Sequence, residues 1–110
     1  MPRRATPHPL ALRVGLRIQR LRKEAGLTAE GLAYESDLGS KGFLSDIENG
    51  LALPSLKTLK ILADHLGVPL LDFVTFPEDD PRQALVDRTR KLTQAAITKL
   101  AHDLRKYEKA

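Results

Sequence analysis

The stretch LGSKGFLSDIENG, from Leu38 to Gly50, contains a Ser-Lys pair flanked by two glycines. Glycine, lysine and serine are the residue types with which a nucleotide-binding loop surrounds phosphate groups. Such a loop follows a β-strand and has its lysine before its serine or threonine, so that backbone N–H groups and the ammonium converge on the phosphates. No strand pattern precedes this stretch, and its serine comes before its lysine. The pattern therefore does not support a phosphate-binding loop.

The same residues are typical of the second helix of a two-helix motif. Leu44 and Ile47 are spaced as on the buried side of a helix. Ser40 can cap the first turn of this helix, and Gly50 can end it. A shorter helix that Thr28 can cap precedes it, with about four turn residues between the two. Two short helices joined in this way, in an otherwise helical chain, indicate a helix-turn-helix.

Helical patterns also surround this pair. Apolar residues at helical spacing predict a first helix in residues 10–26 and a fourth helix from Pro54 to Gly67. The segment PLLDFVTF, which begins at Pro69, predicts a fifth helix that is buried on most sides. No segment shows the two-residue alternation of a strand. The predicted fold class is therefore all-α, with five helices followed by a long C-terminal amphipathic helix.

Composition divides the chain into four segments. We expect a flexible basic arm in residues 1–10, the helix-turn-helix domain in residues 11–76 and an acidic, proline-bounded linker in residues 77–81. In residues 82–110, apolar residues at steps of three and four predict one amphipathic helix of about seven turns. Its apolar stripe would meet a second copy of the chain or pack on the first domain. The residues predicted to form a dimer interface are Leu85, Leu92, Ala96, Leu100 and Leu104.

The net charge of +4 is unevenly distributed. Residues 1–26 carry seven basic residues and one acidic residue, whereas residues 27–50 carry one basic and five acidic residues. Residues 82–110 carry eight basic and three acidic residues. A polyanionic partner fits the two ends, but the acidic middle needs compensation from basic neighbours if it is to approach phosphates. The candidates for such a basic rim are Arg3, Arg4, Arg13, Arg17, Arg20, Lys57 and Lys60.

Several other classes of function have no support in the residues. There is no cysteine, which excludes disulfides, thiolate metal sites and a cysteine nucleophile. The histidines, His8, His65 and His102, share no metal-ligand spacing, and no nucleophile elbow or carboxylate pair is present. We expect no enzymatic activity, metal or cofactor. The chain lacks the apolar runs of a signal peptide or a membrane span, so the sequence predicts a soluble cytoplasmic protein that does not bind a membrane.

Residues 18–68, IQRLRKEAGLTAEGLAYESDLGSKGFLSDIENGLALPSLKTLKILADHLGV, resemble the Xre or lambda-repressor-like helix-turn-helix family. The resemblance covers about residues 12–76 and rests on the patterns IxxLR, Gly-Leu-Thr, LSxIExG and PSLxTLxxLAxxLGV. Members of that family bind operator DNA, usually as two-fold dimers, with the third helix in the major groove. The resemblance therefore implies a dimeric transcription regulator that reads a near-palindromic operator with the helix from Ser40 to Asn49.

The resemblance also implies roles for individual residues. Lys41, Gly42 and Asp46 fall where the family presents residues to base edges, and Asn49 falls where it contacts a phosphate. Arg22 and Glu48 fall where family members join the first and third helices by an ion pair. The DNA-contacting residues predicted in this way, together with Phe43 on the same helix and Lys57 of the basic rim, are Ser40, Lys41, Gly42, Phe43, Asp46, Asn49 and Lys57.

Departures from the family pattern leave a second function open. Ala29 stands where the family usually has a glutamine that contacts phosphate, and the turn is one residue longer than usual. Gly42 presents no side chain, and Asp46 presents an acid. These features suit a helix-turn-helix scaffold that has become a protein-interaction adaptor with weak or no DNA binding. An antitoxin, which binds both DNA and a protein partner, lies between the two functions.

Overall fold

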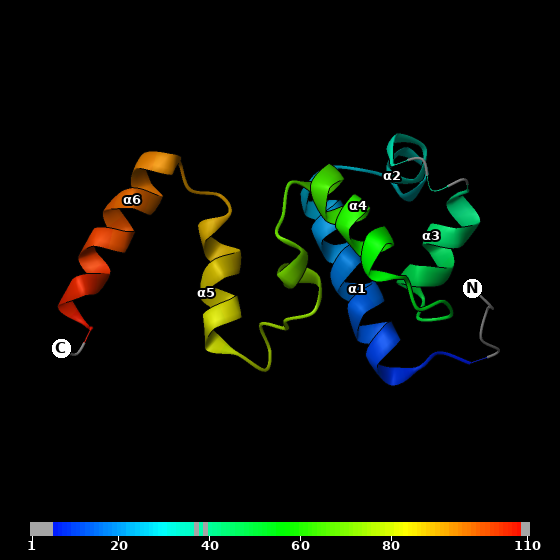
Figure 1. Ribbon diagram of the computed structural model, residues 1–110, viewed down its shortest axis with the longest axis horizontal. Helices are drawn as coiled ribbons and strands as arrows, with labels where there is room; N and C mark the ends of the chain where they lie inside the picture. Colours follow the sequence, from blue (N-terminus) through cyan, green and yellow to red (C-terminus); the bar gives the residue numbers. More distant parts are fainter. Residues whose placement is uncertain (1–5, 37, 39, 109–110) are drawn as a thin grey trace. The chain divides into compact units, whose positions relative to one another are not determined.

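The computed structural model describes residues 6–36, 38 and 40–108, and the chain divides into two compact units, Met1–Thr75 and Phe76–Ala110. All regular structure in the described residues is helical, which confirms the predicted all-α class (Figure 1). The first unit contains α1 (Pro9–Glu24), α2 (Ala29–Glu35), α3 (Lys41–Glu48), α4 (Leu56–Leu66) and the 3₁₀ turn η1 (Leu70–Phe73). The second contains α5 (Pro81–Thr89), α6 (Gln94–Asp103) and the 3₁₀ turn η2 (Leu104–Lys106).

Capping residues set where the helices of the first unit begin. The hydroxyl of Thr28 accepts a hydrogen bond from the backbone N–H of Gly31 (2.9 Å), as predicted for α2. Ser40 caps α3 in the same way through the N–H of Phe43 (3.2 Å). Each cap satisfies one of the backbone donors that a helix start leaves unpaired, so a side chain close in sequence determines the position of the helix start.

The core of the first unit takes side chains from every element of that unit. The helices α1, α2 and α3 pack on one another, while α4 packs on α2 and on η1. Apolar side chains at helical spacing face inward from each of them, as the sequence pattern predicts. The largest side chains without exposed surface are Phe73, Ile18, Leu32, Leu44, Ile47 and Leu62.

Two glycines allow α3 to lie against α1. A Cβ atom on Gly15 of α1 would lie 2.7 Å from the carbonyl oxygen of Glu48 and even closer to that of Ile47. Gly50, at the end of α3, has a φ of +74°, and a Cβ there would lie 2.7 Å from the Cα of Leu12. The first glycine is required by packing, and the second by both packing and backbone conformation.

The prediction of a fifth helix in PLLDFVTF is wrong, because the structure has there only the 3₁₀ turn η1. Phe73 is fully buried as expected, but Leu71 and Val74 are exposed, so the segment is covered on one side only. The helix does not continue at Thr75, whose hydroxyl donates a hydrogen bond to the carbonyl of Leu71 (2.9 Å). The β-branched residues Val74 and Thr75, and Pro77 two residues after Thr75, do not favour continuation of the helix.

The prediction of one long helix in residues 82–110 is also wrong. The structure has two helices, because α5 ends at Thr89 and α6 begins at Gln94. The hydroxyl of Thr93 accepts from the N–H of Ala96 (3.1 Å) and so begins a new helix. The hydroxyl of Thr89 donates to the carbonyl of Val86 (2.6 Å), one turn back. Threonine side chains that bond nearby backbone compete with helix continuation, which the apolar spacing did not reveal.

The ends of the predicted segments also differ in detail. Pro9, which we assigned to the N-terminal arm, already belongs to α1, and the ring of His8 caps that helix by accepting from the N–H of Leu10 (3.2 Å). Asp80 of the acidic segment caps α5 by accepting from the N–H of Arg82 (2.9 Å). The predictions for Arg3 and Arg4, and for the length of the turn that contains Asp37 and Gly39, fall outside the described residues. None of the described helices is both long enough and apolar enough to cross a lipid bilayer.

Candidate nucleic-acid interface

The helix α3 lies at one side of the first unit, packed against α1 and α2 (Figure 1). Leu44 and Ile47 face the core with no exposed surface. Lys41 and Gly42 in its first turn, and Asn49 at its end, are exposed. The helix therefore has one apolar side that fixes it and one polar side that faces outward.

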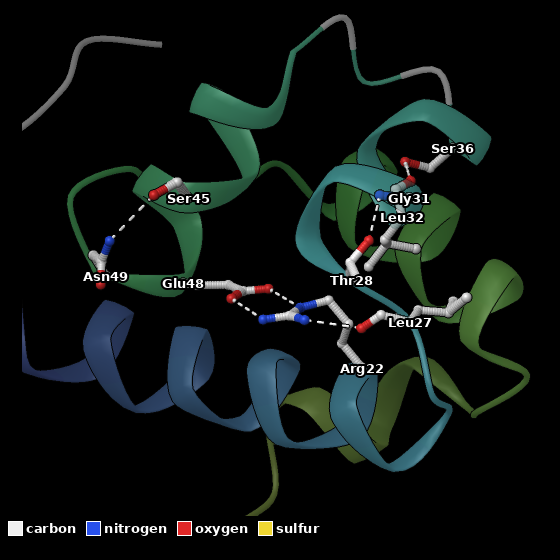
Figure 2. A network of polar contacts seen from close by, with 9 residues as sticks. All are labelled: Arg22, Leu27, Thr28, Gly31, Leu32, Ser36, Ser45, Glu48 and Asn49. Atoms are coloured by element: carbon white, nitrogen blue, oxygen red, sulfur yellow. Dashed lines mark hydrogen bonds and ion pairs between the residues drawn. The ribbon is translucent and has the colours of Figure 1, made fainter.

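A buried ion pair holds α3 to α1. Arg22 of α1 donates from Nε to one carboxylate oxygen of Glu48 (2.7 Å) and from a terminal nitrogen to the other (2.9 Å). Its second terminal nitrogen donates to the backbone carbonyl of Leu27 (2.9 Å). Figure 2 shows the guanidinium between these two partners. One side chain thus joins α1, the connection to α2 and the last turn of α3.

Because this pair is buried, removing one of its partners costs more stability than removing a partner of an exposed pair. The side chains of Arg22 and Glu48 keep only 9% and 5% of their surface exposed. Exposed pairs contribute under about 1 kcal/mol, whereas removal of one partner of a buried pair costs about 3–5 kcal/mol, since the other charge stays buried and unpaired. The pair also neutralises Glu48, so this acid of the 27–50 segment does not oppose an anionic ligand.

The outward side of α3 brings together most of the predicted contact residues. Ser40 and Lys41 lie at its start, and Asn49 lies two turns later, with Nδ2 donating to the hydroxyl of Ser45 (3.4 Å; Figure 2). Ser45 was not among the predicted contact residues, although its position four residues after Lys41 and four before Asn49 places it on their side of a helix. These polar groups form a strip that can donate and accept hydrogen bonds.

The remaining predicted contact residues differ in how exposed they are. Phe43 and Asp46 are half-buried. The backbone carbonyl of Asp46 accepts from the N–H of Leu51 (2.8 Å), which closes the end of α3. Gly42 and Lys57 are exposed, the latter in the first turn of α4.

The basic rim proposed from helix one is smaller than the sequence suggests. Arg17 is buried, and its Nε donates to the backbone carbonyl of Asp72 (2.7 Å), so its assignment to the rim is wrong. It instead ties α1 to η1. Arg20 is exposed but pairs with Glu24 (3.4 Å), and Lys60 pairs with Asp64 (2.7 Å). These pairs reduce the positive potential that the two side chains offer to phosphates.

The five residues predicted for a dimer interface do not share one helix. Leu85 lies on α5, Leu92 lies in the connection, and Leu104 lies in η2. Ala96 and Leu100 lie on α6. The four leucines are exposed, and Ala96 is half-buried. A continuous apolar stripe is therefore replaced by short apolar faces on two helices.

The described histidines lie in different elements. His8 caps α1, the ring of His65 lies 2.9 Å from the carbonyl of Ile61 in α4, and His102 lies in the last turn of α6. Among the residues that the structure describes, no three His, Asp or Glu side chains are grouped as metal ligands.

Comparisons with known proteins found relatives that are named as transcriptional regulators or as a repressor. The chain is 40% identical over 68 residues to an uncharacterized HTH-type transcriptional regulator, y4dJ, of Sinorhizobium fredii, which covers 62% of this chain and 87% of that protein. It is 46% identical over 55 residues to the immunity repressor protein of Bacillus phage phi105, covering 50% of this chain and 38% of the repressor. A third relative, the HTH-type transcriptional regulator DdrOP3 of Deinococcus deserti, is 39% identical over 72 residues, which are 63% of this chain and 55% of the regulator.

The family itself follows from a match over more than half of the chain. No solved structure matches the chain significantly. The sequence model of the family described as "Helix-turn-helix domain" matches residues 13–73, which include α1 from its second turn, α2, α3, α4 and η1. The matched segment contains both the buried ion pair and the polar strip of α3. The chain belongs to the helix-turn-helix family of the Xre and lambda-repressor type.

Proposed function

We propose that this protein is a transcription regulator that binds operator DNA by inserting α3 into the major groove. The observation that carries the proposal is the combination of a polar outer side on α3 with the buried pair of Arg22 and Glu48, which holds that helix at the surface. A recognition helix must present its side chains while its own position stays fixed, and this arrangement does both. The family match and the names of the relatives support the same function.

The residues of the polar strip have distinct roles in this proposal. The ammonium of Lys41 reaches the acceptor atoms of guanine or a phosphate oxygen. The hydroxyl of Ser45 can both donate to and accept from base edges. Asn49, at the end of α3, positions the helix by bonding a phosphate, which carries no sequence information. Sequence reading is therefore assigned to the first turn and a half of α3, and positioning to its end.

The proposed DNA complex contains two copies of the chain. A two-fold dimer places its two α3 helices one duplex turn apart, at about 34 to 36 Å, and so reads a near-palindromic site. The exposed leucines of the second unit are the proposed dimer contacts, since a self-complementary apolar face is the simplest way to form a two-fold assembly.

The test measures binding of the full chain to duplexes that it selects from a random library, by fluorescence anisotropy at two salt concentrations. Replacing Lys41 by Ala is expected to weaken binding roughly tenfold and to lower the salt dependence, because one contact to a base or phosphate is lost. Lys23→Ala, another exposed lysine of the first unit, is the matched control and should bind as the unchanged chain does. Equal effects of the two substitutions, or no duplex binding at low salt, would contradict the proposal.

One structural feature supports the adaptor function. Tyr34 on α2 is 88% exposed, and Glu30 and Glu35 on the same helix are also exposed. An aromatic side chain among acids suits a basic protein partner better than a phosphate backbone. A chain that binds no duplex, together with a stoichiometric partner whose binding requires Tyr34, would favour this second function.

A further inference from the structure

The glycines inside the helices of the first unit differ in how much space a Cβ atom would have at each position. Gly15 of α1 is required, because a Cβ there would collide with the backbone of α3. Gly31 of α2 has less room than usual, since a Cβ would lie 3.1 Å from the capping hydroxyl of Thr28. Gly42 of α3 differs from both. In the described part of the chain, the neighbour of a Cβ built on Gly42 is the hydroxyl oxygen of Ser40, at a relaxed 3.8 Å.

Nothing in the fold of the described residues accounts for glycine at position 42. Its φ is not positive, unlike those of Gly26, Gly50 and Gly67, so its backbone conformation suits any residue. A glycine inside a helix lowers the stability of that helix relative to alanine, and α3 has only eight residues. Gly42 lies on the exposed side of the first turn of α3, where a side chain would face solvent or a bound partner.

We infer that Gly42 forms a notch in the outer side of α3 that admits the C5 methyl group of a thymine. The inference rests on the proposed function and specifies which feature of a base pair Gly42 meets. Without a side chain, the surface at this position is the apolar Cα–H group. The thymine methyl is the apolar feature that base pairs present in the major groove, and so it is the complement of a surface that cannot form a side-chain hydrogen bond.

The neighbours of Gly42 make the notch selective. Lys41 precedes it and Ser45 follows one turn later, and both side chains can bond the base edges on either side of the methyl group. The open side at Gly42 lets α3 approach the base pair more closely than a side chain at that position would allow. Cytosine has no methyl at C5, so the notch favours a T·A pair over a C·G pair by shape.

The test combines a larger residue in the protein with a smaller base in the DNA. Duplexes are selected from a random library by the full chain, and each thymine of the half-site is replaced in turn by deoxyuridine, which lacks only the methyl group. The unchanged chain should lose about fourfold in affinity at one thymine in each half-site, the value of one buried methyl group. Gly42→Ala should bind the thymine duplex roughly tenfold more weakly, because its Cβ occupies the space of the methyl group.

Replacing that one thymine by deoxyuridine should restore most of the affinity of Gly42→Ala, while replacement of other thymines should not. The thermal unfolding midpoint of Gly42→Ala should equal or exceed that of the unchanged chain, since the nearest atom to its Cβ among the described residues lies at 3.8 Å. Gly15→Ala, which pushes α3 away from α1, is the control for binding lost through unfolding. Its affinity should fall on both duplexes together with its midpoint.

The possible outcomes separate the notch from the proposed function. If Gly42→Ala bound the thymine duplex as tightly as the unchanged chain, or if deoxyuridine did not restore its affinity, the notch proposal would be wrong. The proposal that the chain binds DNA would still stand. Failure of the unchanged chain to bind any selected duplex would overturn the proposed function, and the notch with it. Rescue at a single thymine in each half-site establishes the contact.

Discussion

The two units of this chain differ in how many side chains each one buries. In Met1–Thr75, side chains such as Ile18, Leu62 and Phe73 are fully buried, and a buried ion pair joins two helices. In Phe76–Ala110, the buried residue of α5 is Gln83, and α6, all of whose residues are described, has no buried side chain. The first unit thus has its own core, whereas the helices of the second unit have exposed apolar faces.

The difference shows that apolar content alone does not give a unit a buried core. Helices of nine and ten residues are shorter than the roughly 12–15 residues that isolated helices need in water. Ordering each residue costs about 1–2 kcal/mol of backbone entropy, which buried apolar surface must offset. We propose that a second copy of the chain covers the exposed apolar faces of the second unit.

The largest expected effect concerns the ion pair of the first unit. Glu48→Ala should lower the free energy of unfolding by about 3–5 kcal/mol, because the guanidinium of Arg22 stays buried without its carboxylate. Urea unfolding measured by circular dichroism gives this value. The control is Glu24→Ala, whose exposed pair with Arg20 should contribute under about 1 kcal/mol. Equal losses from the two substitutions would show that burial adds nothing to the Arg22 pair.

A pair of leucines gives the next largest effect and compares the two units directly. Leu62→Ala should lower the free energy of unfolding of the first unit by about 2–5 kcal/mol, since it leaves a cavity in the core. Leu100→Asp, on the exposed face of α6, should leave that free energy unchanged but halve the mass measured by light scattering, because a carboxylate is costly in an apolar dimer contact. An unchanged mass would refute the assignment of Leu100 to a dimer interface.

The smallest effect concerns the caps. Ser40→Ala should lower the free energy of unfolding of the first unit by about 1 kcal/mol, since it removes the acceptor for the N–H of Phe43. Thr93→Ala should leave that unit unchanged and reduce the helix content of the second unit, where the cap of α6 is lost. Thermal scans followed by circular dichroism separate the two. A shift of the main transition by Thr93→Ala would mean that the two units unfold together.

The sequence predicted best those features that depend on residues close together in the chain. The caps by Thr28 and Ser40 and the buried positions of Leu44 and Ile47 follow from spacings of three or four residues. The break between α5 and α6 also has a local cause in Thr93 and was missed only because apolar spacing was weighed above capping. For the candidate site, the family resemblance supplied Lys41 and Asn49, and helical spacing from these two would have added Ser45.

By itself, the sequence determined the all-α class, the two helices of the helix-turn-helix motif and the polar composition of the outer side of α3, because these depend on helix periodicity and nearby side chains. Only the tertiary structure decided that Arg17 is buried against the carbonyl of Asp72, 55 residues away, while Arg20 stays exposed. It also decided that Gly15 has no room for a side chain, whereas a Cβ on Gly42 would have its nearest neighbour among the described residues at 3.8 Å. Which elements cover a given side of a helix depends on contacts between distant segments, and periodicity within one helix does not specify them.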